Sequence, residues 1–311
     1  MTPPAEPETA APVGAATPGV AIETPLRRFV SDYLESPVAT IGLCVLVVIL
    51  LLALLAPLIA PQNPYNLAEV DVMDSRLPPG AESMTGLKFW LGTDGAGRDL
   101  LSAMLYGLRI SIFVGVMSCL VAMVLGASIG LVAAYAGGRT EILIMRIVDI
   151  QLSFPAILLA LMLIAVLGKG VDKIIIALVA VQWGYYARTV RGTALVERRK
   201  DYVEAARCLG LSHARIVFHH ILPNCLPPLI VVATVQAAHA IALEATLSFL
   251  GVGLPPTEPS LGLLISNGFE YVLSGKYWIS TFPGLVLLIT IMAINLVGDQ
   301  LRDVLNPRLR R

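Results

Sequence analysis

One charged segment between two apolar stretches carries the residues best suited to recognition chemistry, Asp201-Tyr-Val-Glu-Ala-Ala-Arg-Cys-Leu-Gly210. Glu204 follows Asp201 by three residues, the spacing of a capping box in which the first side chain accepts a backbone N–H and the second reaches back. We therefore predict a helix that begins at Tyr202. It should end at Gly210, because glycine readily takes the left-handed conformation past a helix end.

A second short helix is predicted directly after this turn. Ser212 can cap its start, and the helix is expected to run to about Ile221 and to end before Pro223. On the first helix, Ala205 and Ala206 leave one face almost without side chains, so the groove of another protein could approach its backbone closely. Alanine is also the best helix former, so an ordinary linker helix is the alternative.

Catalytic and metal-binding chemistry find little support elsewhere in the chain. His219 and His220 are adjacent on the predicted helix and therefore about 100° apart, so they cannot share a metal by themselves. The sequence contains no G-x-x-x-x-G-K-[ST] loop that could cradle nucleotide phosphates, and no H-E-x-x-H zinc motif. We predict a chain that is not an enzyme and that holds no catalytic residue, cofactor or metal. Its four cysteines are expected to be small packing residues.

The composition predicts an all-α integral membrane protein. Hydrophobic residues make up 56% of the 311 residues, charged residues only 14%, and the mean hydropathy is +0.78. Six stretches approach the roughly 20 apolar residues that cross a bilayer core. The fourth is short, and its helix should continue through Arg188 toward Leu195. The six stretches are Val38–Ala60, Ile110–Tyr135, Ile142–Leu167, Ile174–Ala187, Leu226–Leu250 and Thr281–Gly298.

The distribution of basic residues predicts the orientation. With the N-terminus inside, the inner segments hold 15 of the 22 Lys and Arg residues and the outer segments hold 7, so both termini and the charged loop are expected in the cytoplasm. Residues 1–25 are predicted to be a disordered tail, and residues 26–34 a short helix at the inner surface. The basic residues around the loop are expected to contact membrane lipid headgroups. Nucleic acid is excluded as a partner, because flanking spans leave the loop no room to enter a groove.

Three separated motifs point to one family. Glu204-Ala205-Ala206, Gly210 and Leu222-Pro223 resemble the EAA signature in the membrane subunits of binding-protein-dependent ABC importers. His220 stands where that signature usually has Ile, a variant that resembles peptide and nickel permeases. The segments 91–111 and 244–253 resemble the C-type permeases of dipeptide, oligopeptide and nickel systems. The chain departs from that pattern at two positions, Ala103 in place of a common Arg and Leu261 in place of a common Trp.

The resemblance implies a type I ABC importer transmembrane domain with six transmembrane helices in the bacterial cytoplasmic (inner) membrane. It implies an N-terminal segment at 26–107 with a periplasmic loop, a transport domain at 108–299, a coupling loop at 197–223 and a cytoplasmic tail at 300–311. The implied partners are two cytoplasmic ATPase subunits, which bind the ATP, a homologous sister permease and an extracytoplasmic substrate-binding protein. Short peptides are the expected cargo. Nickel or another small solute, and a stand-alone channel or facilitator, are the alternatives.

The resemblance also assigns roles to the loop. Glu204 would cap and orient the coupling helix, and Gly210 would make the turn. The other residues expected to couple the loop to an ATPase are Ala205 and Ala206, which permit close contact, the apolar anchors Tyr202 and Leu211, and the closing pair Leu222 and Pro223.

Polar and aromatic residues in or near the spans are candidates for lining or gating a pathway. Asp149 lies one helical turn after Arg146, so an ion pair is the alternative to gating. Glu244 could face either the pathway or the sister permease. For the remaining candidates, helix packing is the alternative to lining a route for a peptide: Gln182, Trp183, Gln236 and Asn295.

Overall fold

The described part of the chain is helical. The computed structural model describes residues 25–66, 70–83, 86–255 and 257–305, and within these ranges there is no strand. The tail predicted at residues 1–25 lies outside them except for Pro25, which is the first residue of a helix. Residues 306–311 also lie outside the described ranges. The helices are α1 (Pro25–Leu34), α2 (Pro37–Leu54), α3 (Ala56–Ile59), α4 (Leu100–Ala136), α5 (Gly138–Ser153), α6 (Ala156–Leu167), α7 (Val171–Glu197), α8 (Asp201–Cys208), α9 (His213–Arg215), the π-helix η2 (Ile216–Ile221), α10 (Leu222–Phe249), α11 (Leu261–Phe269) and α12 (Trp278–Leu305), with 3₁₀ turns η1 (Val72–Asp74) and η3 (Val272–Ser274).

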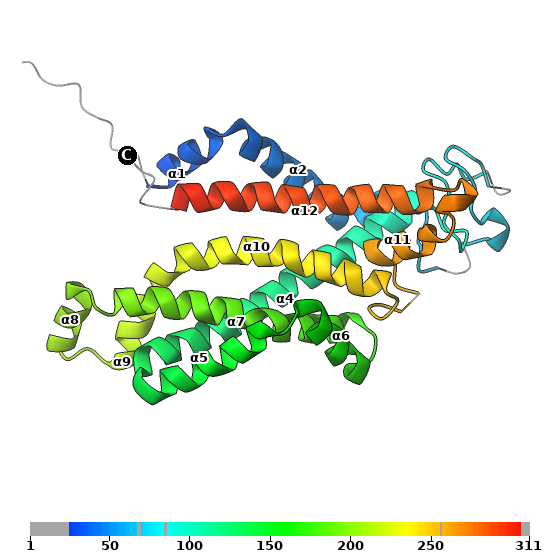
Figure 1. Ribbon diagram of the computed structural model, residues 1–311. Helices are drawn as coiled ribbons and strands as arrows, with labels where there is room; N and C mark the ends of the chain where they lie inside the picture. Colours follow the sequence, from blue (N-terminus) through cyan, green and yellow to red (C-terminus); the bar gives the residue numbers. More distant parts are fainter. Residues whose placement is uncertain (1–24, 67–69, 84–85, 256, 306–311) are drawn as a thin grey trace, which may run out of the picture.

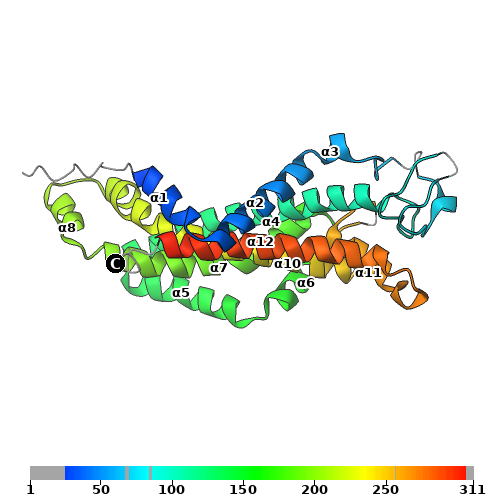
Figure 2. The same ribbon diagram turned by 90° about the horizontal axis from the view of Figure 1, so that it is seen from above.

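The long helices run between two distinct ends of the molecule. Both views place α8 at one end, and α11 with the segment before α4 at the other (Figures 1 and 2). We call these the loop end and the cap end. Large apolar side chains on the outer faces of the long helices are exposed, for example Leu288 of α12 and Phe113 of α4, as expected for surfaces that meet lipid tails.

The predicted count of six membrane spans is not confirmed. Among the described residues, four helices are long and apolar enough to cross a membrane, Pro37–Leu54, Leu100–Ala136, His213–Phe249 and Trp278–Leu305. The predicted third span is broken: α5 and α6 meet at 91° around Phe154 and Pro155 and count at most as one bent span. Proline cannot continue the helix, and it favours extended backbone at the residue before it.

α7 extends the predicted fourth span in both directions, to Val171 and Glu197, and so passes Leu195 as expected. It is long enough to cross a bilayer, but it carries Gln182, Arg188 and Arg191, which lower its apolarity. With these polar residues, α7 is not among the four helices that are apolar enough to count as spans, although the sequence analysis predicts one here.

Close approach of α4 to α7 depends on glycines. A Cβ built on Gly126 would lie 2.3 Å from the carbonyl oxygen of Trp183, and one on Gly130 would lie 2.5 Å from that of Ala187. The sequence Gly126-Ala-Ser-Ile-Gly130 has the G-x-S-x-G pattern of a hydrolase motif. In hydrolases that motif forms a strand-to-helix turn, whereas here all five residues lie within α4. The glycines therefore serve backbone-to-backbone packing.

Gly130→Ala is expected to destabilise the protein by about 1–3 kcal/mol, because the added methyl group overpacks the contact with α7. Gly192→Ala is the matched control, since a Cβ there meets no atom within 4 Å and alanine favours a helix over glycine by up to about 1 kcal/mol. Thermal unfolding in detergent measures both. Equal stability of Gly130→Ala and wild type would contradict the packing role.

The cap end is held by polar contacts before α4. Arg98 and Asp94 form a buried ion pair, with Nε 2.7 Å from Oδ2. Asp99 caps α4 by accepting from the backbone N–H of Ser102 at 2.8 Å, while Gln62 Oε1 accepts from the Asp99 N–H at 2.7 Å. The segment 91–111, which the sequence identifies as a motif, thus fixes the start of the longest helix.

The predicted short helix near the N-terminus is confirmed as α1. Its Tyr33 packs against Val304, and the Asp32 carbonyl accepts from Gln300 Nε2 at 3.3 Å. These contacts order the end of α12, which continues to Leu305 where a tail was predicted from residue 300.

Candidate functional site

The first helix of the charged loop forms as predicted, but without the predicted capping box. α8 begins at Asp201, its N-cap is Lys200 in extended conformation, and no side chain caps it. An N-cap residue must have extended backbone, and the turn that leaves α7 gives Lys200 that conformation. Asp201 is therefore already helical, and the Glu204 backbone N–H bonds to the Lys200 carbonyl at 3.3 Å.

Gly210 ends α8 in the left-handed conformation, as predicted, with φ of +71°. The backbone N–H of Gly210 donates to the Arg207 carbonyl at 2.9 Å, and that of Leu211 donates to the Ala206 carbonyl at 3.2 Å. This pair of bonds is a Schellman motif, which satisfies the last carbonyls of the helix. The turn direction, and with it the exit of the chain, depends on the conformation of Gly210.

The second predicted helix does not end before Pro223. Ser212 caps its start by accepting from the Arg215 backbone N–H at 3.4 Å, as predicted, but the helix continues as η2 into α10 without a break. The wider π-helical turn lies directly before Pro223, which has no N–H to donate to the preceding turn. The Asn224 side chain donates to the His220 carbonyl at 2.7 Å. The loop is thus joined rigidly to a spanning helix.

The two alanines of α8 face opposite surroundings. Ala206 is buried with Val203 in a hydrophobic cluster that α8 forms with α4, α7, η2 and α10, here called the loop-end core, whereas Ala205 is exposed. Beside it, Leu209 has 79% of its surface exposed, a residue that the sequence prediction omitted. Leu211 packs partly buried against the same core. Ala205 and Leu209, rather than the alanine pair, therefore contribute apolar accessible surface at the end of α8, next to the exposed Cys208.

The Tyr202 side chain is hydrogen-bonded to other residues of this chain. Its hydroxyl donates to Glu197 Oε2 at 2.6 Å and accepts from Asn224 Nδ2 at 3.1 Å. Lys200 Nζ donates to the other Glu197 oxygen, Oε1, at 2.6 Å. Partial burial and the bond to the carboxylate raise the pKa of Tyr202 to about 12. These contacts link the end of α7, the start of α8 and the start of α10, and Glu197 was not singled out in the sequence.

If α8 couples to an ATPase, as the family resemblance implies, Tyr202→Phe should weaken that coupling moderately, by about threefold to tenfold, because it removes one hydrogen bond to a charged group while keeping the ring. ATP hydrolysis stimulated by substrate-loaded receptor is the measurement. Tyr33→Phe on α1 is the matched control, since the Tyr33 hydroxyl has no hydrogen-bond partner among the described residues. Unchanged stimulation in Tyr202→Phe would show that the hydroxyl does not hold α8.

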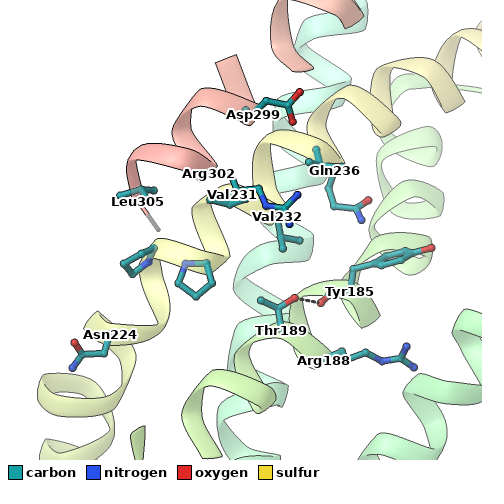
Figure 3. A pocket seen from close by; sticks show the side chains of 14 residues that line it. Tyr185, Arg188, Thr189, Asn224, Val231, Val232, Gln236, Asp299, Arg302 and Leu305 are labelled. Atoms are coloured by element: carbon teal, nitrogen blue, oxygen red, sulfur yellow. Dashed lines mark hydrogen bonds between the residues drawn. The ribbon is translucent and has the colours of Figure 1, made fainter. Parts of the chain in front are cut away.

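A cavity of about 890 Å³ lies between α7, α10 and α12. Figure 3 shows Gln236 of α10 and Tyr185 of α7 on facing sides of this space, with Asp299 and Arg302 on α12. A second cavity of about 260 Å³ lies nearer the cap end, between α6, α7 and α10. Two predicted pathway residues, Gln182 and Gln236, line it together.

The other pathway candidates lie apart. Trp183 lines an apolar groove between α4 and α7, and Asn295 is exposed on α12. Asp149 is exposed, and its Oδ1 lies 2.5 Å from Nη2 of Arg188 on α7. The ion pair proposed from sequence spacing was with Arg146. The observed partner comes from the neighbouring helix, which spacing along one helix cannot reveal.

Glu244 is fully buried at the cap end. Its Oε2 accepts from Ser111 Oγ of α4 at 2.7 Å, its Oε1 accepts from Ser248 Oγ at 2.8 Å, and Ser260 before α11 also bonds to the carboxylate. Gly262 packs against Ala245, where an added Cβ would lie 2.2 Å from the carbonyl oxygen. Two motifs far apart in the sequence, 91–111 and 244–253, therefore meet at one carboxylate.

Two family models match the chain. Residues 98–311 match the model described as the binding-protein-dependent transport system inner membrane component. Residues 24–79 match the N-terminal TM domain of oligopeptide transport permease C. Together they include the loop, both cavities and most of the cap end.

Curated relatives match over almost their whole length. The chain is 41% identical over 289 residues to the dipeptide transport system permease protein DppC of Escherichia coli K12, covering 93% of this chain and 95% of the relative. It is 37% identical over 297 residues to the di/tripeptide transport system permease protein DppC of Pseudomonas aeruginosa, covering 95% and 96%. These relatives are transport permeases, which agrees with the prediction of a chain that is not an enzyme.

A solved structure shares the fold. An inward-facing structure of the MetNI methionine ABC transporter aligns with a TM-score of 0.54 and 22% identity, covering 66% of this chain and 96% of that chain. The likeness supports the predicted type I ABC importer fold.

Proposed function

The chain belongs to the family of binding-protein-dependent transport system inner membrane components, and we propose that it is one permease subunit of an ATP-driven importer of short peptides. In this proposal it forms half of a translocation pathway and works by alternating access. The names of the relatives, dipeptide and di/tripeptide permeases, favour peptides over nickel or another small solute.

The observation that carries the proposal is the construction of the loop end. α8 stands at the extremity of the molecule (Figure 1), with Glu204, Ala205 and Leu209 exposed and Val203 and Ala206 buried beneath them. An accessible helix with a firmly packed underside suits docking in a groove of another protein. We infer that this groove belongs to a cytoplasmic ATPase subunit, so that the loop end faces the cytoplasm and ATP is bound by two separate ATPase subunits.

The path from the loop into the membrane supports coupled movement. α8 is tied through Tyr202 to α7 and α10, and η2 passes directly into α10, which lines both cavities. A displacement of α8 would therefore be transmitted to the helices beside the cavities. π-Helical turns occur often at functional sites, and η2 lies where such a displacement would enter α10.

A sister permease and an extracytoplasmic receptor complete the proposed complex. The cavity wall formed by α7 and α10 leaves Tyr185 and His239 exposed, a surface that a homologous permease would enclose into a shared pathway. The receptor would deliver peptide to the cap end, whose ordered segment 86–99 lies opposite the loop end (Figure 2).

Co-purification and reconstitution test the proposal. The tagged protein, extracted in mild detergent from cells that express its neighbouring transport proteins, should bring down an ATPase, a second permease and, with substrate, a receptor. The same complex in proteoliposomes should take up radiolabelled trialanine only with ATP and receptor. A protein that is isolated alone and moves solute without ATP would be a facilitator, and the proposal would be wrong.

A further inference from the structure

A long groove with apolar walls lies between α4 and the continuous helix formed by α9, η2 and α10. Its lining residues fall within 123–136 on α4 and within 213–229 on the other side, and its volume is about 550 Å³. Among them, Phe218 is 62% exposed and Val132 is 55% exposed. The groove is therefore open on the outside of the molecule, on a surface that the spanning helices turn toward lipid.

The groove has the length of one leaflet of a bilayer. The α4 residues 123–136 cover about 20 Å along the helix axis, at 1.5 Å per residue. Half of a bilayer measures about 15 Å for its hydrocarbon part and about 20–22 Å with its headgroup layer. A lipid tail that lies parallel to the helices would therefore run along the whole groove.

The volume of the groove suits a slender chain. An α-helix with its side chains is at least about 10 Å wide, so a length of 20 Å occupies about 1,600 Å³. This is nearly three times the groove volume of about 550 Å³. The groove thus fits a lipid tail better than a helix of another protein.

Polar groups of the groove gather at its loop end. The Tyr135 hydroxyl and His213 Nδ1 are hydrogen-bonded, and the two rings form a T-shaped pair with centroids 5.5 Å apart. Figure 1 places α9, which contains His213, at the loop end. The other polar lining residue, Ser128, donates its hydroxyl to the Val124 carbonyl of its own helix at 2.7 Å. The groove therefore combines an apolar length with one polar end, as a phospholipid does.

Two arginines lie next to this polar end. Arg139 follows Ala136 by three residues, Arg215 follows Ala214 directly, and both alanines line the groove. Both arginines are exposed, and neither forms an ion pair with any residue that the structure describes. Guanidinium groups bind phosphate oxygens in bidentate geometry, and basic residues at a membrane surface attract anionic lipid.

We propose that this groove binds one anionic phospholipid of the leaflet at the loop end. One acyl chain would lie along α4, and the phosphate would be held by Arg139 and Arg215. The chain would also contact Val217 and Phe218 and so pack against η2. This inference goes beyond the proposed function, since it requires only that the long helices cross a membrane and does not depend on the cargo.

Native mass spectrometry of the full-length protein, delipidated in detergent, tests the site. The protein is titrated with dioleoylphosphatidylglycerol, which is anionic, or with dioleoylphosphatidylcholine, which has the same tails and no net charge. The first phosphatidylglycerol should bind about tenfold more tightly than phosphatidylcholine, because only its headgroup brings a net negative charge to the two arginines. Equal affinity for the two lipids would overturn the proposal.

A double variant, Arg139→Gln with Arg215→Gln, locates the headgroup. It should bind phosphatidylglycerol about tenfold more weakly than wild type and phosphatidylcholine equally well. Arg27→Gln with Arg28→Gln is the matched control, because it removes the same charge from exposed residues of α1 and should keep the preference. Equal losses in the two double variants would show a response to overall charge and refute the site.

Val132→Trp tests the groove itself. The larger side chain should fill part of the groove and weaken the binding of both lipids by about tenfold. Val116→Trp is the matched control, since Val116 is also an exposed apolar residue of α4 and lies outside the groove. It should bind both lipids as wild type does. Thermal unfolding of both variants should equal that of wild type, because both side chains are exposed.

A different occupant would give a different result. If Val132→Trp binds both lipids like wild type but no longer co-purifies with a second permease, the groove is a protein interface and the lipid site is wrong. The lipid titrations use the isolated chain and need neither ATP nor peptide. A failure of the proposed peptide import would therefore leave their outcome unchanged, and the two proposals can fail separately.

Discussion

Gly210→Pro is expected to abolish ATP-driven uptake while leaving membrane insertion intact. Proline fixes φ near −65°, whereas the Schellman turn holds Gly210 at +71°. The substitution also removes the N–H that donates to the Arg207 carbonyl. A misfit of about 3 kcal/mol or more corresponds to a loss of about a hundredfold in the docking-competent conformation. Uptake of trialanine in proteoliposomes and co-purification of the ATPase are the measurements.

Gly210→Asn is the matched control. Asparagine takes the left-handed conformation more easily than other non-glycine residues, and a Cβ at this position meets no atom within 4 Å. We therefore expect uptake within about threefold of wild type, which corresponds to less than about 1 kcal/mol. Full activity of Gly210→Pro would refute the docking role of the turn. Equal loss in both variants would show that the site needs a glycine for contact rather than for conformation.

The turn was predictable because its cause is local. Glycine at the end of a helix and serine two residues later are signals carried by single residues, and both act in the structure as predicted. The capping box failed for a related reason. Asp201 and Glu204 have the right spacing, but the extended conformation that defines an N-cap was set by the preceding turn at Lys200, which the spacing of side chains does not encode.

Contacts between helices were beyond prediction from one sequence. Asp149 has basic residues both on its own helix and on α7, and only the packing of α5 against α7 selects Arg188. Likewise, Ala205 and Ala206 are neighbouring residues of the same type, but only Ala206 is buried in the loop-end core. The bend between α5 and α6 was signalled by Pro155, yet its angle of 91° depends on packing against the rest of the bundle. These failures share one cause, since tertiary contacts decide among locally equal alternatives.

Glu244→Leu is expected to damage the cap end and spare the loop end. The carboxylate accepts from Ser111, Ser248 and Ser260, which belong to α4, α10 and the start of α11. Leucine has no acceptor, so the buried serine hydroxyls lose their hydrogen-bond partner. We expect the free energy of unfolding to fall by about 1–3 kcal/mol in total. Thermal unfolding should shift to lower temperature, and receptor-dependent uptake should fall by about tenfold or more. ATPase co-purification should remain at the wild-type level, because α8 and α11 lie at opposite ends of the molecule (Figure 1).

Glu244→Gln separates a packing role from a role of the charge. Glutamine keeps the shape and one acceptor oxygen and adds an –NH₂ group that the serine oxygens can accept from, so a packing role predicts near wild-type stability and uptake. Equal loss of uptake in Glu244→Gln and Glu244→Leu, with normal stability in the former, would mean that the negative charge itself takes part in transport. The cluster geometry favours packing, since both carboxylate oxygens are already engaged by serines of this chain and no surface of the side chain is left for a solute or a sister permease.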